Sequence, residues 1–224
     1  SATMPRSAGD IVADLRALLV AAGVRPPYVL VGHSFGGLVV RLFASTVPDE
    51  VVGLVLVDAA QEEFWTRLKA LVTPEQWKGM ITGTPPELAD YRDFEKLDVD
   101  ASAAEMRRAA AARPLRPLPL IVLSRGLPME LSPDMSAKLP ANFSAEQERI
   151  WQNCQDELVA LVPGAQHVVA TNNETIADAL GQSSPGMAMH YAKEADLRKK
   201  MTGVVRRFDR RMNKAATKAV KPTD

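Results

Sequence analysis

Residues 28–46 read YVLVGHSFGGLVVRLFAST, and this stretch decides the fold. Its first four residues are apolar and rich in β-branched side chains, which predicts a short strand. From Leu38 onward, apolar residues recur at helical spacing. The glycines of GHSFGG lie between the two segments, where the chain needs a tight turn. The stretch therefore predicts a strand, a tight turn and a helix, in that order.

The turn contains the pentapeptide Gly32-His33-Ser34-Phe35-Gly36, which has the G-x-S-x-G pattern. In this pattern a serine on a strained strand-to-helix turn points its hydroxyl away from the sheet. Small residues two before and two after the serine, here Gly32 and Gly36, let the strand and helix backbones approach closely. Ser34 is the predicted nucleophile, and the N–H of Phe35 is the predicted oxyanion donor. The alternative is a glycine-rich turn with an incidental serine.

Three further apolar segments predict strands: VVGLVLVDAA (51–60), residues 119–125 within PLPLIVLSRG, and QHVVAT (166–171). Helical spacing is present in residues 10–22, with Asp10 as the expected N-cap and Gly23 as the stop, and in residues 144–162. Near-continuous apolar strands that alternate with helices indicate an α/β fold. Its sheet is expected to be mostly parallel and covered on both faces.

Length and composition exclude several classes of protein. The chain has 224 residues, of which 46% are hydrophobic and 24% charged, so collagen, coiled coil and full disorder are excluded. Its one cysteine, Cys154, cannot form an internal disulfide and has no partners for a zinc set, so no metal or cofactor is predicted. No apolar stretch reaches the roughly 18 residues that span a bilayer. A soluble, cytoplasmic protein without a membrane partner is expected.

The chain divides into two parts in this interpretation. Residues 1–171 form the core, and about sixty of them, residues 61–118, are predicted to form a helical cap over a site. Residues 172–224 form a basic helical tail. The whole chain balances 27 basic against 27 acidic residues, but the segment from His190 to the end has eleven basic and four acidic residues. This uneven charge indicates two different pieces of protein.

Residues 5–171 resemble the α/β-hydrolase superfamily, and more narrowly its bacterial esterase-like branch. The resemblance is carried by DLRALLVAAG, YVLVGHSFGGLVVRLFAS, EVVGLVLVDAAQEE, PLRPLPLIVLSRG and QDELVALVPGAQHVVA, in the family's order. It implies a doubly wound parallel sheet and a Ser-acid-His triad in that chain order. The serine would attack a small-molecule ester and form an acyl-enzyme after a histidine removes its proton.

The acid of the implied triad is predicted to be Asp58. It ends the strand that follows the Ser34 turn, which in this superfamily is called the nucleophile elbow. One subset of the superfamily carries its acid at this position. The more usual position follows the next strand, but the turn of residues 124–127 has no carboxylate, and the first ones beyond it are Glu130 and Asp134. These two remain alternatives. Asp58 could also be a residue that caps the next segment.

The base is predicted to be His167, because the chain has only three histidines: His33, His167 and His190. The side chain of His33 is expected to project away from the serine. His167 lies in PGAQH (163–167), which resembles the family ending PGxGH. Closer esterase relatives place a histidine-bearing HVVA strand first and the catalytic histidine several residues later, in a G-H pair that is absent here. The alternative is therefore a structural histidine at a strand edge.

The resemblance also implies a core shortened at its N-terminus. Family members normally have four strands and an oxyanion-hole loop before the elbow, whereas Ser34 has thirty-three residues ahead of it. Weak activity is expected, because the loss of one oxyanion donor costs about 2.7 to 4 kcal/mol. The elbow strand would have an open edge. A symmetric homodimer through this edge is expected, and the alternative cover is residues 174–215.

Residues 174–201, ETIADALGQSSPGMAMHYAKEADLRKKM, resemble the end of a tyrosine recombinase of the phage-integrase type. Tyr191 matches the nucleophilic tyrosine, but Gln182 stands where that family has a histidine. The preceding arginine and lysine partners are not found, so recombination is not expected. Basic residues of the tail could neutralise DNA phosphates, but a solvated helix of mixed charge is the favoured interpretation.

The sequence thus predicts a serine ester hydrolase of the carboxylesterase type. Ser34, His167 and Asp58 form its triad, and the N–H of Phe35 its oxyanion donor. Two alternatives stay open: a catalytically impaired hydrolase fragment, which the missing strands favour, and a DNA-associated protein that uses the basic tail.

Overall fold

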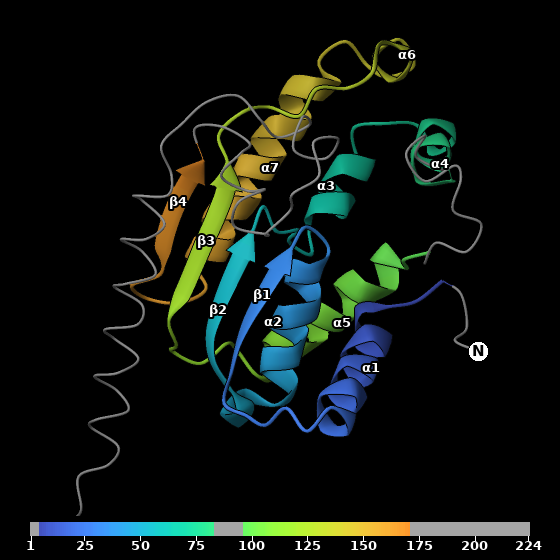
Figure 1. Ribbon diagram of the computed structural model, residues 1–224. Coiled ribbons are helices and arrows are strands. Elements are labelled where there is room, and N and C mark those ends of the chain that lie inside the picture. The colour runs from blue at the N-terminus through green and yellow to red at the C-terminus, as the bar shows by residue number, and fades with distance from the viewer. Residues whose placement is uncertain (1–4, 83–95, 171–224) are drawn as a thin grey trace, which may run out of the picture. The chain divides into compact units, whose positions relative to one another are not determined.

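The computed structural model describes residues 5–82 and 96–170, and Figure 1 shows how their elements are arranged. The strands are β1 (Tyr28–His33), β2 (Val51–Val57), β3 (Leu120–Arg125) and β4 (Gln166–Ala170). The helices are α1 (Ala8–Ala21), α2 (Gly36–Thr46), α3 (Phe64–Lys69), α4 (Pro74–Thr82), α5 (Val99–Ala112), α6 (Pro133–Ser136) and α7 (Phe143–Val159), with a 3₁₀ turn η1 (Pro48–Glu50). The predicted tail of residues 172–224 lies outside the described residues.

The strands form one sheet in the order β1-β2-β3-β4. β1 pairs in parallel with β2, and β2 with β3, so that one row across the sheet joins Leu30, Leu54 and Leu120. The arrow of β4 runs in the same direction as the other three (Figure 1). The predicted α/β fold with a mostly parallel sheet is therefore confirmed.

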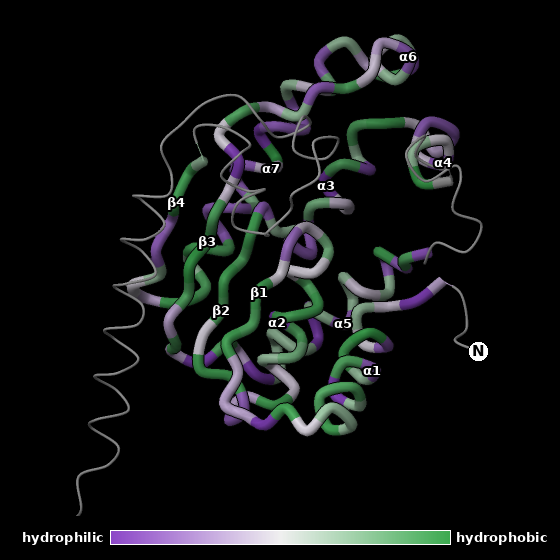
Figure 2. Tube along the Cα trace, viewed as in Figure 1, coloured by the Kyte–Doolittle hydropathy of each residue, from purple (hydrophilic) through white to green (hydrophobic). Residues whose placement is uncertain are grey.

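A helical layer packs on one face of this sheet. α2 contacts β1 and β2, and α1 and α5 both contact α2. Alternate strand residues, Leu54, Leu56 and Val122 among them, join Leu38 and Phe43 of α2 in one buried hydrophobic cluster. Figure 2 shows the apolar character of the strands along the chain. Burial of such side chains, at about 25 cal/mol per Å², is the main force that holds α2 against the sheet.

The start of α1 differs from the prediction. Ser7, rather than Asp10, is the N-cap residue, and its side chain accepts a hydrogen bond from the N–H of Asp10. Asp10 lies at the third helical position and its carboxylate accepts from the N–H of Ser7, at 3.0 Å, which closes a capping box. The predicted stop is confirmed, since Gly23 follows the helix with a φ of +67°.

The segment predicted as a cap contributes to two different regions. α3 packs against α7, and with α4 it lies toward the carboxyl ends of the strands (Figure 1). α5, in contrast, contacts α1 and α2 and belongs to the helical layer. Its small alanine side chains permit this close packing, as Ala103, 2% exposed, illustrates. For residues 61–82 a cap over the site stays a prediction.

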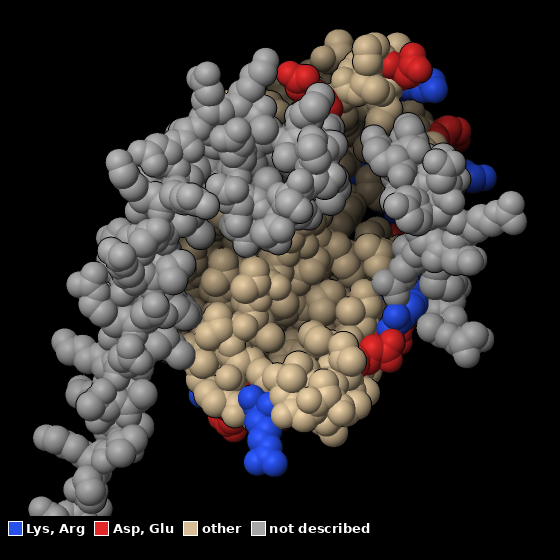
Figure 3. Space-filling view, in the orientation of Figure 1, with Lys and Arg blue, Asp and Glu red and all other residues tan. Residues whose placement is uncertain are grey.

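β1 is one edge of the sheet that the described residues form. Its Val29 and Val31 are 42% and 54% exposed, on the face opposite to α2. Figure 3 shows that the surface over β1 and the neighbouring strands has no charged side chains among the described residues. The expected homodimer through this edge stays a prediction. Of the helices within residues 5–82 and 96–170, none has the length and hydropathy needed to cross a membrane.

Candidate functional site

The turn between β1 and α2 has the geometry of a nucleophile elbow. Ser34 is exposed and has a φ of +50°, a left-handed conformation that costs a residue with a side chain free energy. Hydrogen bonds hold it there: its N–H donates to the carbonyl of Val57 at 3.1 Å, and its carbonyl accepts from Gly37 at 3.0 Å and Ala60 at 2.9 Å. The turn is thus fixed between β2 and the residues that follow it.

Close packing around the turn requires glycine at two positions. A Cβ on Gly32 would lie 2.5 Å from the carbonyl oxygen of Gly36 and 2.6 Å from Val40 Cγ2, and a Cβ on Gly37 would lie 2.4 Å from the Cβ of Ala59. At Gly36 a Cβ would meet no atom within 4 Å. The predicted need for a small residue is therefore confirmed at Gly32. It is not found at Gly36, where a Cβ would have free space.

Gly32 and Gly36 provide a matched test of the packing around the turn. We expect Gly32→Ala to destabilise the fold by about 1–3 kcal/mol, because the new methyl group must displace backbone. Gly36→Ala, at the first residue of α2, is expected to change stability by less than about 0.5 kcal/mol. Urea unfolding followed by tryptophan fluorescence measures both. Equal effects of the two substitutions would contradict this account of the turn.

The N–H of Phe35, the predicted oxyanion donor, lies at the N-terminus of α2. Phe35 is the N-cap residue of α2, with a φ of −55° and a ψ of −31°. Among residues 5–82 and 96–170, no acceptor receives a hydrogen bond from this N–H. The positive end of the dipole of α2 adds to its attraction for a negative oxygen. An anion formed beside Ser34 would therefore find a donor one residue away.

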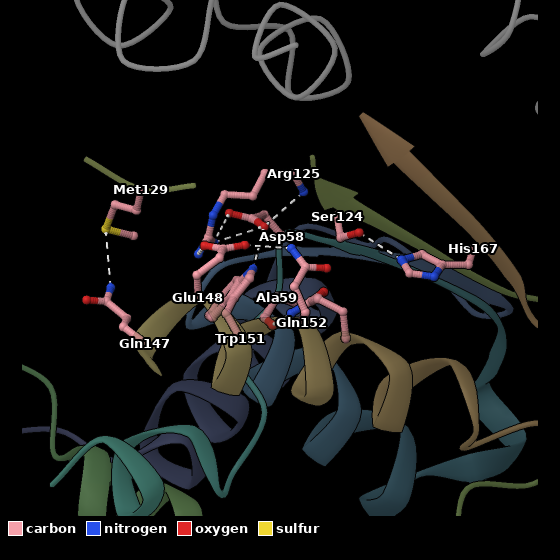
Figure 4. A network of polar contacts seen from close by, with 11 residues as sticks. Asp58, Ala59, Ser124, Arg125, Met129, Gln147, Glu148, Trp151, Gln152 and His167 are labelled. Atoms are coloured by element: carbon pink, nitrogen blue, oxygen red, sulfur yellow. Dashed lines mark hydrogen bonds and ion pairs between the residues drawn. The ribbon is translucent and has the colours of Figure 1, made fainter. Parts of the chain in front are cut away.

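Asp58 is buried and held by cationic and neutral donors. It is 4% exposed, has a φ of +42°, and donates its N–H to the carbonyl of Leu123 at 2.6 Å. Its carboxylate accepts from the Arg125 backbone N–H at 3.2 Å, from Arg125 Nη1 at 3.1 and 3.3 Å, and from Trp151 Nε1 at 3.0 Å. Figure 4 shows these contacts at the carboxyl ends of β2 and β3.

The guanidinium of Arg125 is the centre of this network. Besides Asp58, it donates through Nη2 to Glu148 at 3.1 Å, and its Cζ lies 4.3 Å from the ring centroid of Trp151. Arg125 itself is 3% exposed. A buried cation must be paired to persist, so Asp58 and Glu148 neutralise it. Asp58 thus takes part in a buried ion pair between β2, β3 and α7.

His167, in β4, is bound to a different serine from the predicted one. Its Nε2 lies 2.7 Å from the hydroxyl of Ser124, a fully buried residue of β3, and its Nδ1 lies 4.0 Å from an oxygen of Asp156. The direction of the hydrogen bond depends on the tautomer of the ring. The contact connects β4 to β3 beside the Arg125 network (Figure 4).

The described residues do not bring the three predicted triad members together. β2 and β3 lie between the strand before Ser34 and the strand of His167. Three strand spacings of about 4.8 Å put β1 and β4 about 14 Å apart, and the ring of His167 faces Ser124. No hydrogen bond within residues 5–82 and 96–170 joins the Ser34 hydroxyl to His167 or Asp58. The sequence does not reveal that His167 binds Ser124 and that Asp58 binds Arg125, because these contacts depend on the direction of each side chain.

The alternative site residues lie elsewhere. Glu130 and Asp134 are exposed in the segment after β3, and neither is hydrogen-bonded to His167. Burial lowers the pKa of His33 below its ordinary value, and the charge of Asp58 acts in the opposite direction. His33 therefore lies in the electrostatic field of Asp58.

Arg41 and Glu62, which were not predicted from the sequence, fix the loop after β2. Arg41 of α2 is 2% exposed and binds Glu62 through two hydrogen bonds of 2.7 and 3.2 Å. Burial alone would raise the pKa of Glu62, but the hydrogen bond and charge of Arg41 lower it below its usual value. The signal was present in LVVRLFAS, since a single arginine within an apolar helix needs a buried partner.

Cys154 offers a test of the packing between α7 and the loop after β2. Burial raises the pKa of its thiol to about 11, and the sulfur lies 3.8 Å from both Arg67 Nη1 and Gln61 Oε1. At about pH 8 only about a thousandth of such a thiol is ionised. We expect a thiol reagent to modify the folded protein far more slowly than the urea-unfolded one. Equal rates would show that α7 is not packed as described.

Comparisons with known proteins show which family the chain resembles. A family model described as "Alpha/beta hydrolase family" matches residues 1–211. The uncharacterized protein YqjL of Bacillus subtilis (strain 168) is 30% identical over 171 residues, which are 75% of this chain and 57% of that protein. The pimeloyl-[acyl-carrier protein] methyl ester esterase of Chromobacterium violaceum is 31% identical over 155 residues, which are 67% of this chain and 56% of that protein.

Among solved structures, a probable hydrolytic enzyme from Pseudomonas aeruginosa PAO1 is 20% identical, with a TM-score of 0.47; the match covers 76% of this chain and 64% of that one. The chain spans little more than half the length of the two curated relatives above. These comparisons do not show the similarity of residues 174–201 to tyrosine recombinases, which stays a prediction. The family match, together with the elbow at Ser34, establishes that the chain belongs to the alpha/beta hydrolase family.

Proposed function

We propose that the chain is a serine ester hydrolase in which Ser34 is the nucleophile. The observation that carries the proposal is the strained, exposed Ser34 between β1 and the N-terminus of α2. Its Oγ would bond to the carbonyl carbon of a small-molecule ester and its proton would pass to a base. The N–H of Phe35 would stabilise the negative oxygen. The alcohol would leave with a proton, and water would then hydrolyse the acyl-enzyme.

For the base and its acid, the proposal retains His167 and Asp58. Asp58 directly follows β2 and His167 lies in β4, in the chain order that the family resemblance implies. To act, the ring of His167 must exchange the hydroxyl of Ser124 for that of Ser34, and Asp58 must exchange a donor of the Arg125 network for the imidazole. Because β2 and β3 lie between His167 and Ser34, catalysis in this form requires β4 to leave its place beside β3 and carry the imidazole across about 14 Å.

A second candidate is an impaired hydrolase that is acylated but turns over slowly. The same contacts favour it, because a histidine bound to Ser124 cannot activate the water that releases the acyl group. A DNA-associated function would use the tail, which lies outside the described residues.

Steady-state and burst kinetics with p-nitrophenyl acetate separate the two candidates. For the proposed hydrolase, we expect continuing turnover, which His167→Ala and Asp58→Asn each lower by a factor on the order of 10² or more. Asp49→Asn is the control, because Asp49 is exposed and lies at the amino end of β2, the opposite end from Asp58. For the impaired form, about one equivalent of p-nitrophenol would be released without turnover. Turnover unchanged in His167→Ala would exclude His167 as the base.

A further inference from the structure

Two aromatic rings lie beside the elbow. Phe35 directly follows Ser34, and its ring centroid is 6.1 Å from that of Trp65, with the ring planes inclined by 59°. Trp65 is the second residue of α3, and both side chains are half-buried. This contact joins the start of α3 to the residue that follows the proposed nucleophile, and each ring keeps part of its surface accessible to a bound molecule.

Packing holds Trp65 in this place. Its ring is 5.8 Å from that of Phe64, in an edge-to-face arrangement, and Phe64 lies 4.9 Å from Trp151 of α7 in the same way. Trp65 also packs against both hydrophobic clusters of the described residues, the one under the sheet and the one between α3, α4 and α7. Aromatic pairs of this geometry restrict one another's orientation.

Ion pairs fix the segment on both sides of Trp65. Glu62 is paired with the buried Arg41 of α2 at 2.7 Å, and Glu63 with Arg107 of α5 at 3.2 Å. On the other side, Arg67 donates to Glu157 of α7 at 2.7 Å. The start of α3 is thus tied to α2, α5 and α7. Because these contacts hold Trp65 in place before a substrate binds, binding does not have to order it.

We propose that Trp65 is a specificity-determining residue, whose indole together with the Phe35 ring receives an aryl group of the ester. This inference rests on the proposed function of Ser34. An aryl group can pack on the two rings in an offset or edge-to-face arrangement, which a small alkyl group cannot do. The substrate class is therefore esters that carry an aromatic ring close to the scissile bond.

The test uses the full chain and two fluorophosphonates that differ only in one substituent, phenyl or methyl. Ser34 Oγ forms a bond to phosphorus, fluoride leaves, and the hydroxyl proton passes to solvent. Intact-mass spectrometry gives the rate of labelling by each reagent. Each reagent has the same intrinsic reactivity in every experiment. We therefore compare the ratio of the phenyl to the methyl labelling rate in each variant with the same ratio in the natural sequence.

We expect Trp65→Leu to lower this ratio by about tenfold. Trp65→Phe keeps a ring at the position and is expected to retain most of the preference, which also serves if Trp65→Leu folds poorly. Trp77→Leu removes a tryptophan of the same hydrophobic cluster that makes no ring contact with Phe35, and is expected to leave the ratio unchanged.

Two results would overturn the inference in distinguishable ways. If Ser34 is labelled but Trp65→Leu keeps the ratio of the natural sequence, or Trp77→Leu lowers it equally, Trp65 does not determine specificity and the proposed function stands. If neither reagent labels Ser34 in any folded variant, the proposed function fails and the inference fails with it.

Discussion

Ser34→Ala is expected to abolish both the initial release and the turnover of p-nitrophenol from p-nitrophenyl acetate. The Ser34 hydroxyl is the only group of the proposed mechanism that forms a covalent bond with the substrate, so no other side chain can replace it. Loss of a serine nucleophile lowers turnover by a factor on the order of 10³ or more. The measurement is the absorbance of p-nitrophenol against a buffer blank, with urea unfolding to show that the variant folds.

Ser45→Ala is the matched control for this substitution. Ser45 is buried near the C-terminal end of the same helix α2, so the change removes a serine hydroxyl from this helix far from the proposed nucleophile. We expect the control to keep the hydrolysis rate of the natural sequence. If Ser34→Ala retains the rate of its control, the hydrolysis that is measured does not come from the elbow.

Arg125→Met is expected to destabilise the fold by about 3–5 kcal/mol. The methionine fills much of the volume of the arginine but leaves the carboxylates of Asp58 and Glu148 without their shared cation. A buried carboxylate without a partner is costly, because its hydration is lost and not replaced. Urea unfolding measures the loss, and the slope m shows whether the native state stays compact.

A double-substitution cycle shows that the loss comes from the ion pair. Asp58→Asn in the Arg125→Met background removes the unpaired charge, so the double variant is expected to be more stable than the sum of the two single losses predicts. Arg149→Met is the surface control, since Arg149 forms an exposed pair with Glu146. Its loss is expected to be about 0–1 kcal/mol. Equal losses at Arg125 and Arg149 would contradict a buried network.

The parts of the fold that follow from local pattern were predictable. Continuous apolar runs such as VVGLVLV are typical of buried parallel strands, and the strand, turn and helix around Ser34 have the predicted order. The left-handed φ of Ser34 gives physical form to the G-x-S-x-G pattern. Periodicity carries this information because it repeats along each element.

Partners far apart in the sequence were not predictable in the same way. Asp58 and His167 have the residue types and the chain order of a triad, yet the structure directs one to Arg125 and the other to Ser124. Neither Arg125 nor Ser124 has a pattern that marks it as a partner, because both read as the polar end of an apolar strand. Similarly, Asp10 was predicted as the N-cap of α1, but Ser7 takes this position and forms a capping box with Asp10. Serine and aspartate are both good N-cap residues, so the residue type does not decide between them.

The central claim is that the hydroxyl of Ser34 is a reactive nucleophile. Its most direct test is to treat the full chain with a fluorophosphonate and to locate the adduct by peptide mass spectrometry. The account predicts one adduct, on Ser34, that is absent from Ser34→Ala and present in Ser45→Ala. A folded chain that forms no adduct, or one whose adduct lies on another residue, would contradict it.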